Sequence, residues 1–218
     1  MILHSFALSD VGRVRTRNED AFVVRSDIGL FAVADGMGGH AAGDVASKTA
    51  VDALANAMTI SNDESLIHHA VQLANIAVWE RGQHEPDKAG MGTTLTAAVF
   101  SEDRDHVTIG HVGDSRCYLL RAGKLERLTQ DHSIGANLLT RAIGTRPDVD
   151  VDIEAAGVKA GDIFLICSDG LHGIIDDAHL HAILKQEKPI QEIANDLIES
   201  ANLRGGPDNI TALLIKAV

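Results

Sequence analysis

The sequence predicts an α+β fold in which the helices are segregated from antiparallel β-sheet. The chain has 218 residues, of which 45% are apolar, enough for one continuous hydrophobic core. Short apolar segments typical of strands follow one another in runs, whereas segments with helical periodicity come in pairs. This order differs from the strict alternation of strand and helix that indicates a parallel sheet, so it favours a layered α+β domain.

The predicted strands are short apolar segments bounded by turn residues. We expect them at residues 2–8, 20–26, 30–34, 94–100, 106–112, 116–121, 125–128, 162–167 and 209–216. Four other segments have apolar residues at intervals of three and four, which gives a helix one apolar stripe. These lie at residues 44–58, about 63–82, 176–185 and 190–202, and Asn62 or Asp63 could cap the second of them.

Residues 131–152 fit neither pattern. They contain a short stretch with helical character and then the polar, proline-containing run GTRPDVDVD. Long irregular segments in compact domains are often mobile and functional, although a plain surface loop is an equal alternative. Because the sequence shows no internal repeat and no linker, we expect residues 1–218 to form a single domain with a flap at about 131–152.

Composition and charge exclude several classes of protein. The net charge of −12 argues against nucleic acid or an anionic membrane as the main partner, because both require a basic surface. No apolar stretch is long enough for a membrane span, and the N-terminal residues lack the order of a secretory signal, so we expect a cytoplasmic protein. Cys117 and Cys167 lie in apolar runs without CxxC spacing, which predicts buried free thiols.

Carboxylates flank several of the predicted strands. They are Glu19, Asp20, Asp35, Asp114, Asp169 and Asp208. If these strand ends converge at one end of a sheet sandwich, the acids would repel one another strongly unless a cation lay between them. A cluster of hard oxygen ligands without thiolates favours Mg²⁺ or Mn²⁺ over zinc.

Glycines accompany these acids. Gly36 follows Asp35, and the small residue allows a tight turn in which its carbonyl could also reach a cation. Each such pair alone is an ordinary turn sequence, but their recurrence at several strand ends favours a metal site. The spacing of Gly36, Gly38 and Ala41 also matches a dinucleotide fingerprint, yet two helices follow without the required second strand. A Walker loop fails because Ser47 stands where glycine is required.

The acids belong to six motifs spread over nearly the whole chain. The motifs are RTRNEDA (15–21), DGMGGH (35–40), GTT (92–94), GDSR (113–116), SDG (168–170) and DNIT (208–211). In this order they resemble the metal-dependent protein phosphatase family, also called protein phosphatase 2C, and in particular its compact bacterial branch. The resemblance implies a four-layer αββα sandwich, with two antiparallel β-sheets flanked by paired helices. It also implies hydrolysis of phosphoserine and phosphothreonine in proteins.

The resemblance implies a set of metal ligands. Asp35 would bridge two core ions, Mg²⁺ or Mn²⁺, with Asp169 and Asp208 completing one of them. The Gly36 carbonyl would serve the other ion together with Glu19 or Asp20, which the sequence does not separate. Asp114 matches the position that, with Asp169, holds a weaker third ion in bacterial relatives.

The implied mechanism is direct attack by a water shared between the two ions, without a covalent intermediate. Neither cysteine begins a Cys-x₅-Arg loop, which agrees with this. Arg15 falls where the family places a phosphate-binding guanidinium, whose fork suits two phosphoryl oxygens; a surface charge is the alternative.

The source of the leaving-group proton stays open. Animal members carry a histidine two positions after the bridging acid, where this chain has Met37. His40 is therefore a candidate general acid, although we favour a hydrogen-bonding role at the start of the helix, and water held by the ions is a further proton source.

The remaining histidines are not expected to take part in catalysis or metal binding. We expect His111 and His132 to be structural. His68, His69, His172, His179 and His181 are interpreted as solvated or helix-face residues. Thr93 and Thr94 are expected to pack in the sheet.

Partners follow from the resemblance. We expect a monomer that acts on phosphorylated proteins and opposes a cognate bacterial serine/threonine kinase. Arg141 or Arg146 of the flap could contact the substrate protein. One rival is a non-catalytic module that binds phosphoprotein or metal, which the intact acids at 35, 169 and 208 argue against; another is a small-molecule phosphatase.

Overall fold

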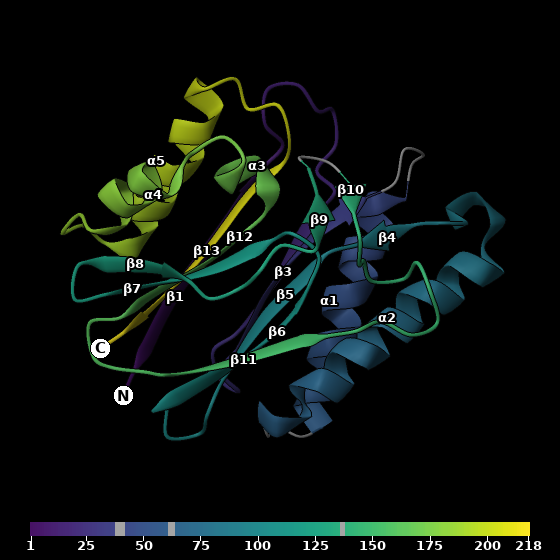
Figure 1. The fold of residues 1–218 in the computed structure, drawn as a ribbon, viewed down its shortest axis with the longest axis horizontal. Coiled ribbons are helices and arrows are strands. Elements are labelled where there is room, and N and C mark those ends of the chain that lie inside the picture. The colour runs from purple at the N-terminus through teal and green to yellow at the C-terminus, as the bar shows by residue number, and fades with distance from the viewer. Residues whose placement is uncertain (38–41, 61–63, 136–137) are drawn as a thin grey trace.

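A computed structural model of the chain describes residues 1–37, 42–60, 64–135 and 138–218. Two antiparallel β-sheets lie face to face, and helices cover the outer face of each sheet (Figure 1). The predicted α+β sandwich with four layers is therefore confirmed. Both termini lie at one end of the sandwich, and the loops described below as the site lie at the other (Figure 1).

The first sheet has the strand order β11-β6-β5-β3-β2, and the short β4 pairs with β3. Its strands are β2 (Asp20–Arg25), β3 (Leu30–Met37), β4 (Gly92–Thr93), β5 (Leu95–Phe100), β6 (His106–Val112) and β11 (Asp152–Gly157). β3 extends beyond the expected 30–34, so Asp35 lies within the strand, directly opposite Asp20 of β2. β11 was not predicted, because its sequence DIEAAG has little apolar character; pairing with β6 makes it an edge strand.

The second sheet has the order β1-β13-β12-β7-β8. Its strands are β1 (Leu3–Asp10), β7 (Arg116–Arg121), β8 (Lys124–Arg127), β12 (Ile163–Cys167) and β13 (Ile210–Ala217). All of its strand pairs are antiparallel, and every strand expected from the sequence is present. The free cysteines at 117 and 167 are buried, as predicted.

Two pairs of helices form the outer layers. α1 (Gly43–Ile60) and α2 (Ile67–His84) cover the first sheet, and α4 (Asp177–Leu184) and α5 (Ile190–Leu203) cover the second (Figure 1). The 3₁₀ turn Glu64–Leu66 precedes α2, and the 3₁₀ turn Pro86–Lys88 follows it. Asn62 and Asp63, the suggested caps, lie outside the described residues. Asp176 caps α4 by accepting a hydrogen bond from His179 N–H.

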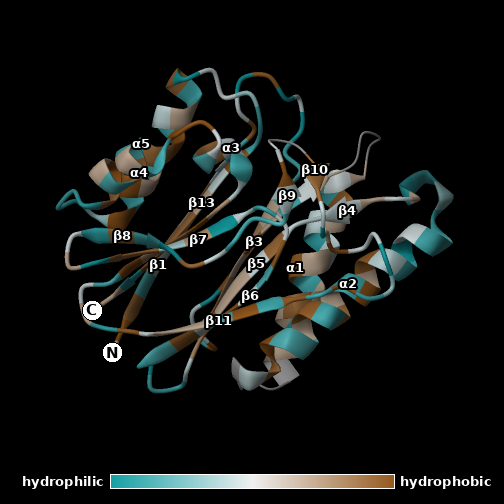
Figure 2. Cartoon of the chain, in the orientation of Figure 1, coloured by the Kyte–Doolittle hydropathy of each residue, from teal (hydrophilic) through white to brown (hydrophobic). Residues whose placement is uncertain are grey.

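The space between the sheets is filled by apolar side chains from both. Phe100 of β5 packs edge to face against Phe31 and Phe164, with ring centroids 5.7 and 5.3 Å away. Because Phe31 belongs to the first sheet and Phe164 to the second, this aromatic cluster joins the layers. Hydrophobic residues follow the central strands, and hydrophilic residues follow the loops and outer helix surfaces (Figure 2).

Residues 131–152 form no helix in their described part, so the expected helical stretch was wrong. Instead β9 (Ser133–Ile134) pairs with β10 (Leu138–Leu139) in a small hairpin. Gly135 has φ +66°, a left-handed conformation that ends the strand and does not fit a right-handed helix.

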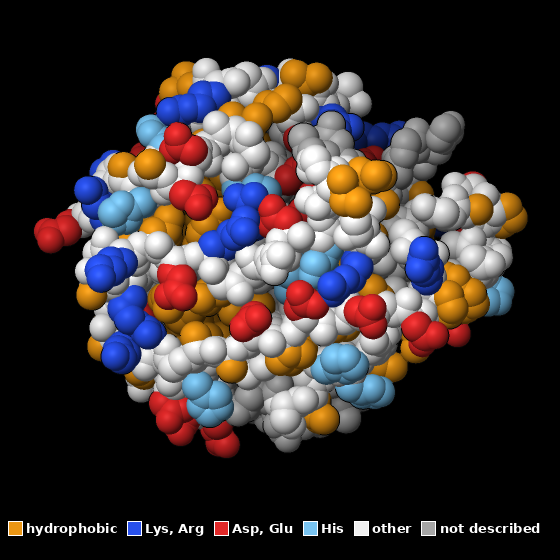
Figure 3. Space-filling model, in the orientation of Figure 1, with side chains coloured by type: hydrophobic (Ala, Val, Ile, Leu, Met, Phe, Trp, Pro, Cys, Tyr) orange, Lys and Arg blue, Asp and Glu red, His pale blue; other side chains and the backbone are white. Residues whose placement is uncertain are grey.

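Acidic and basic side chains are interspersed on the face shown in Figure 3. Within the described parts of the chain, no helix has both the length and the apolar character to cross a bilayer.

Candidate active site

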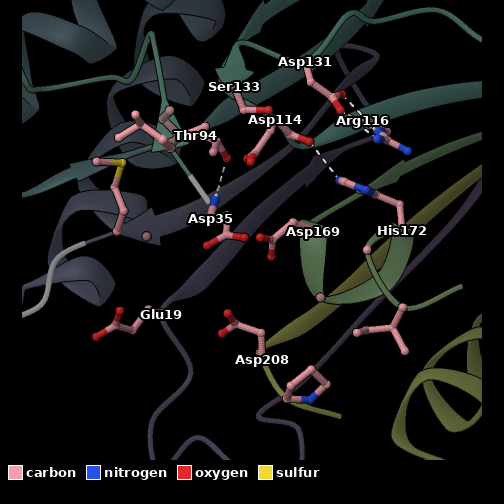
Figure 4. Close-up of a pocket in the computed structure, with 18 of the residues that line it drawn as sticks. Glu19, Asp35, Thr94, Asp114, Arg116, Asp131, Ser133, Asp169, His172 and Asp208 are labelled. Atoms are coloured by element: carbon pink, nitrogen blue, oxygen red, sulfur yellow. Dashed lines mark hydrogen bonds and ion pairs between the residues drawn. The ribbon is translucent and has the colours of Figure 1, made fainter. Parts of the chain in front are cut away.

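A polar cavity of about 860 Å³ opens at the end of the sandwich opposite the termini. Several segments far apart in the sequence contribute to its lining (Figure 4). Of the predicted site residues, those that line it are Arg15, Glu19, Asp35, Gly36, Asp114, Asp169 and Asp208. Asp20 lies behind this lining, and His40, the candidate general acid, lies outside the described residues. The strand-end acids therefore converge as the sequence predicted.

Asp35 stands at the centre of the cluster, near the end of β3. Thr94 holds its backbone in both directions: Asp35 N–H donates to Thr94 Oγ1 at 2.9 Å, and Thr94 N–H donates to the Asp35 carbonyl oxygen at 2.9 Å. The carboxyl group of Asp35 faces that of Asp169 (Figure 4). Burial, followed by the charges of Asp20 and Asp169, raises the pKa of Asp35 well above its ordinary value.

Asp169 is the first residue of the short helix α3 (Asp169–His172), which follows β12. Burial and the charge of Asp208 raise its pKa. Gly170 must be glycine here, because a Cβ atom would overlap the carbonyl oxygen of Asn209. The SDG turn can therefore pack directly against the DN turn, which brings Asp169 and Asp208 together.

Asp20 and Glu19 occupy different positions. The Asp20 Oδ2 atom accepts hydrogen bonds from the hydroxyls of Ser168 at 2.7 Å and Thr211 at 2.6 Å. Its Oδ1 atom is buried and has no hydrogen-bond partner among the described residues. Burial raises the pKa of Asp20 to about 7. Glu19 lines the cavity itself, and its backbone carbonyl accepts from Gly36 N–H at 3.1 Å.

Arg15 and Asp208 form an ion pair at the mouth of the cavity, with Nη2 and Oδ2 2.8 Å apart. The Arg15 side chain is 53% exposed, so its guanidinium is accessible to a ligand. Asn209 anchors the loop that carries Arg15: its Oδ1 accepts from Glu19 N–H at 2.8 Å, and its Nδ2 donates to the Arg17 carbonyl at 2.8 Å.

Asp114 follows β6 at the other side of the cavity. Burial and the charge of Asp169 raise its pKa to about 6. His172 Nε2 donates to the Asp114 backbone carbonyl at 2.8 Å, and its half-buried ring lines the cavity. His172 was expected to be a solvated or helix-face residue; it does lie on a helix, α3, but the cavity that it lines was not foreseen. Its spacing of three from Asp169 was the available signal, since residues three apart share one face of a helix.

Two arginines near the cavity and in the flap, Arg116 and Arg141, have structural partners. Arg116 donates to both carboxylate oxygens of Asp131, from Nε at 2.9 Å and from Nη2 at 2.6 Å. Arg141 pairs with Asp152, whereas Arg146 is exposed. Thr94 does pack in the sheet, as expected, and it also supports Asp35.

The donor set fits hard divalent cations. Among the described residues, no salt bridge reaches Asp35 or Asp169, although their carboxyl groups face each other (Figure 4). Two carboxyl groups that face each other in a buried site require either a shared proton or a cation between them. The unpartnered Oδ1 of Asp20 is a further oxygen directed at neither a protein donor nor solvent. Carboxylate and carbonyl oxygens are the ligands that Mg²⁺ and Mn²⁺ prefer.

A tighter group of ligand-type side chains lies elsewhere. Asp103, Asp105 and His106 gather on the exposed turn before β6. This turn precedes the first residue of β6, whereas the cavity lies beyond its last residue, Val112. Ser101 donates to both acids, so ordinary turn hydrogen bonding accounts for the group.

A model of the protein phosphatase 2C family matches residues 12–214 of the chain. This protein belongs to the protein phosphatase 2C family. The family membership agrees with the six motifs, and the solved relatives confirm the sandwich fold.

Three similar proteins or domains match this chain over nearly their full length. The serine/threonine phosphatase stp of Listeria innocua is 36% identical, over 98% of this chain and 96% of that protein. PppA of Pseudomonas aeruginosa has a TM-score of 0.91 at 35% identity, over 100% of this chain and 99% of that one. The catalytic domain of the phosphatase PstP, solved with 2 manganese ions, has a TM-score of 0.89 at 37% identity, over 99% and 98% of the two chains.

Proposed function

We propose that this protein hydrolyses phosphoserine and phosphothreonine in phosphorylated proteins, with Mg²⁺ or Mn²⁺ as the cofactor. The observation that carries the proposal is that the Asp35 and Asp169 carboxyl groups face each other in a cavity lined by further acids (Figure 4). Such a cluster is suited to bind divalent cations and, through them, a phosphoryl group. Family membership and relatives named serine/threonine phosphatases support the substrate class.

The proposed ligands follow the geometry of the cavity. Asp35 would contact two ions, with Asp169 and Asp208 on one of them. The Gly36 carbonyl and Glu19 would serve the other. We assign direct contact to Glu19 rather than Asp20, because Glu19 lines the cavity while Asp20 is engaged from behind by two hydroxyls.

A weaker third ion is part of the same proposal. Asp114 and Asp169 would hold it, since both line the cavity and the charge of Asp169 acts on Asp114. Asp114 comes from the opposite side of the cavity to Asp208, which leaves room for an ion apart from the core pair (Figure 4).

The chain's own residues would orient and stabilise the phosphoryl group. When bound, the divalent ions supply positive charge that lowers the pKa of a water molecule and neutralises phosphoryl oxygens. Arg15 would turn its exposed guanidinium toward two phosphoryl oxygens, for which its planar fork is suited. Thr94 would keep Asp35 in place through paired backbone contacts.

The surroundings of the cavity suggest where a substrate protein would lie. Ser133, Leu138 and Leu139 of the hairpin line the cavity, so we propose that residues 131–152 form a flap of the single catalytic domain 1–218. Arg146 is exposed for contact with substrate, whereas Arg141 is engaged by Asp152. We further propose a monomeric cytoplasmic enzyme that opposes a bacterial serine/threonine kinase.

The first experiment tests the substrate class. Turnover of a phosphothreonine peptide is compared with that of a nucleotide and a sugar phosphate, first with Mn²⁺ and then with excess chelator. We expect the phosphopeptide to be hydrolysed, only when the ion is present. Equal turnover of the small molecules would indicate a small-molecule phosphatase. Mn²⁺ binding without any turnover would indicate a non-catalytic module.

The second experiment tests the site. Asp35→Asn is expected to remove nearly all phosphopeptide hydrolysis while the protein stays folded by circular dichroism, because the variant loses the charge shared between the ions. Asp52→Asn, on the exposed face of α1, is the matched control and should retain wild-type activity. Retained turnover in Asp35→Asn would contradict the proposal.

A further inference from the structure

His132 belongs to none of the six motifs, yet it is hydrogen-bonded to the turn that carries Asp114. Both backbone polar groups of Gly113 are bonded to it: Gly113 N–H donates to His132 Nδ1 at 3.1 Å, and His132 N–H donates to the Gly113 carbonyl oxygen at 2.7 Å. Gly113 directly precedes Asp114 in the chain. A substitution at His132 would therefore alter the hydrogen bonds of the residue next to Asp114.

The imidazole of His132 is held in one orientation. Because Nδ1 accepts a hydrogen bond, the ring proton is on Nε2, which donates to Asp152 Oδ2 at 2.9 Å. The side chain is 4% exposed, and its ring centroid lies 4.7 Å from that of His111. Such a ring has partners at both nitrogens and little room to rotate.

The turn itself has no freedom to adjust on its other side. Gly113 has φ +109°, and a Cβ atom there would lie 2.6 Å from the Thr94 side chain. Thr94 also holds the backbone of Asp35. The Gly113 turn is thus confined between Thr94 on one side and His132 on the other.

His132 is itself a residue of the flap, residues 131–152, and it connects the Gly113 turn to the rest of that segment. Its carbonyl oxygen accepts from Thr140 N–H at 2.8 Å, and its ring partner Asp152 pairs with Arg141. Asp152 begins β11, which is bonded along β6. One buried residue therefore contacts the Gly113 turn and the two ends of residues 138–152.

We propose that His132 is a positioning residue that holds the Gly113–Asp114 turn in place and links it to residues 138–152, so that the Asp114 carboxylate stays directed into the cavity. The inference rests on the proposed function in one respect, namely that Asp114 takes part in holding the weakest divalent ion. A histidine that only fills the core would affect stability, whereas a positioning residue affects ion binding in variants that keep the fold.

Two substitutions separate the hydrogen bonds of His132. Asn places Oδ1 where His has Nδ1, two bonds from Cβ, so His132→Asn keeps the acceptor for Gly113 N–H and loses the donor to Asp152. Gln places an amide nitrogen three bonds from Cβ, as His Nε2 is, so His132→Gln keeps the donor and loses the acceptor. Asp114→Asn serves as the reference for loss of the carboxylate.

The measurement is Mn²⁺ binding by titration calorimetry, without substrate. We expect Asp114→Asn to weaken the weakest site and His132→Gln to weaken it about 10-fold, while the tighter ions are unchanged and His132→Asn stays within about 3-fold of wild type. Thermal unfolding reports separately on the stability of each variant. Rescue by Asn but not by Gln identifies the bond to Gly113 as the one that matters.

The other outcomes overturn the inference in distinguishable ways. If Asp114→Asn weakens a site and His132→Gln does not, His132 has no positioning role and the proposed function stands. If Asn and Gln weaken the site equally, the Gly113 bond is not responsible. If Asp114→Asn binds Mn²⁺ as wild type does, the inference falls with the third-ion assignment. Hydrolysis by wild type and its loss in Asp35→Asn still decide the proposed function.

A second pair of variants tests the link to the flap, and decides the matter if His132→Gln does not fold. Asp152→Ala removes the partner of His132 Nε2, whereas Asp150→Ala removes one negative charge nearby from an exposed residue that contacts Arg141 only through its backbone carbonyl in the described hydrogen bonds. We expect Asp152→Ala to weaken the same Mn²⁺ site about 3-fold and Asp150→Ala to leave it unchanged. Equal binding by both variants would overturn the link.

Discussion

Two aspartates at opposite ends of the molecule, Asp162 and Asp35, differ in the charge of the group that lies against them. Near the termini, Asp162 is 1% exposed and accepts hydrogen bonds from Arg121 Nε at 2.9 Å and Nη2 at 2.6 Å. At the cavity, Asp35 faces not a guanidinium but the carboxyl group of Asp169. The first pair is neutral within the chain, whereas the second accumulates negative charge.

This difference separates structural acids from site acids. A desolvated carboxylate is tolerated when a hydrogen-bonded cation lies against it, as at Arg121. Two carboxyl groups in contact lower the stability of the fold unless a proton or a bound cation lies between them. Among the described residues, neither Asp35 nor Asp169 has a salt-bridge partner, and a divalent ion that arrives from solution explains this arrangement.

Asp169→Asn is expected to have the largest effect. The substitution removes one of the two facing charges and so weakens metal binding. Loss of several kcal/mol of transition-state stabilisation by the metal would lower phosphopeptide hydrolysis by about 10³-fold. In excess chelator the same variant should unfold at a higher temperature than wild type, because the repulsion between carboxylates is relieved. Added Mn²⁺ should stabilise wild type more than the variant. Activity assays and thermal unfolding measure these effects.

A matched control sharpens this test. Asp87→Asn changes the same residue type where the side chain is 77% exposed and should alter neither property. A variant at 169 that is less stable than wild type in chelator would show that Asp35 and Asp169 are not in repulsion.

Arg121→Ala tests the balanced pair. The substitution leaves Asp162 buried without its cation, and we expect the free energy of unfolding in urea to fall by about 2 to 3 kcal/mol. Activity per folded molecule should be unchanged, because Arg121 lies at the far end of β7 from the cavity. Arg25→Ala breaks the exposed pair with Asp27 and should have a much smaller effect. Equal losses would show that burial of Asp162 is not what makes Arg121 important.

The stability of the metal-free protein should depend on pH with a characteristic sign. Burial raises the pKa of Asp20 from 3.8 to about 7 and that of Asp114 from 3.8 to about 6. The folded state therefore binds more protons than the unfolded state between these limits, so the free energy of unfolding falls as pH rises through them. In excess chelator we expect the unfolding temperature to drop from about pH 4 to about pH 7.

The same titration with saturating Mn²⁺ should behave differently. Deprotonated carboxylates bind the ion more tightly, so the downward trend should weaken or reverse. An unfolding temperature that rises with pH in chelator would contradict the account of the acid cluster.

Asp176→Ala is expected to have the smallest effect. Asp176 is an exposed acid that has no salt bridge in the described parts of the chain; its Oδ1 accepts from His179 N–H at 2.8 Å at the start of α4. Loss of this cap should lower the free energy of unfolding by about 1 kcal/mol and leave hydrolysis unchanged. Asp176→Ser, which can still cap, should recover most of the difference. Loss of activity in the alanine variant would place α4 in contact with the site after all.

Much of the fold was predictable from local patterns. Every expected strand is present, because alternating or continuous apolar runs between turn residues require a buried sheet. β11 was missed since its residues are mostly exposed and only pairing with β6 makes them a strand. The helical stretch in residues 131–152 was wrong because Gly135 adopts a left-handed conformation that the pattern does not reveal.

The site was predictable in its members and not in its arrangement. The acids were found because each stands at a strand end, and antiparallel strands bring alternate ends together. Thr94 was assigned a packing role because it opens an apolar strand, and His172 was set aside because the histidines have no consistent ligand spacing. Their contacts with Asp35 and Asp114 come from the packing of β5 and α3.

By itself, the sequence determined the strands and helices with clear apolar periodicity and which acids would meet, since periodicity, turn residues and strand ends act over a few neighbouring positions. Only the tertiary structure decided that Glu19 faces the cavity while Asp20 turns to Ser168 and Thr211, and that His132 bonds the turn before Asp114. Asp20 and Thr211 are 191 positions apart. Side-chain direction and burial at such sites depend on contacts between distant segments, which exist only once the two sheets have packed.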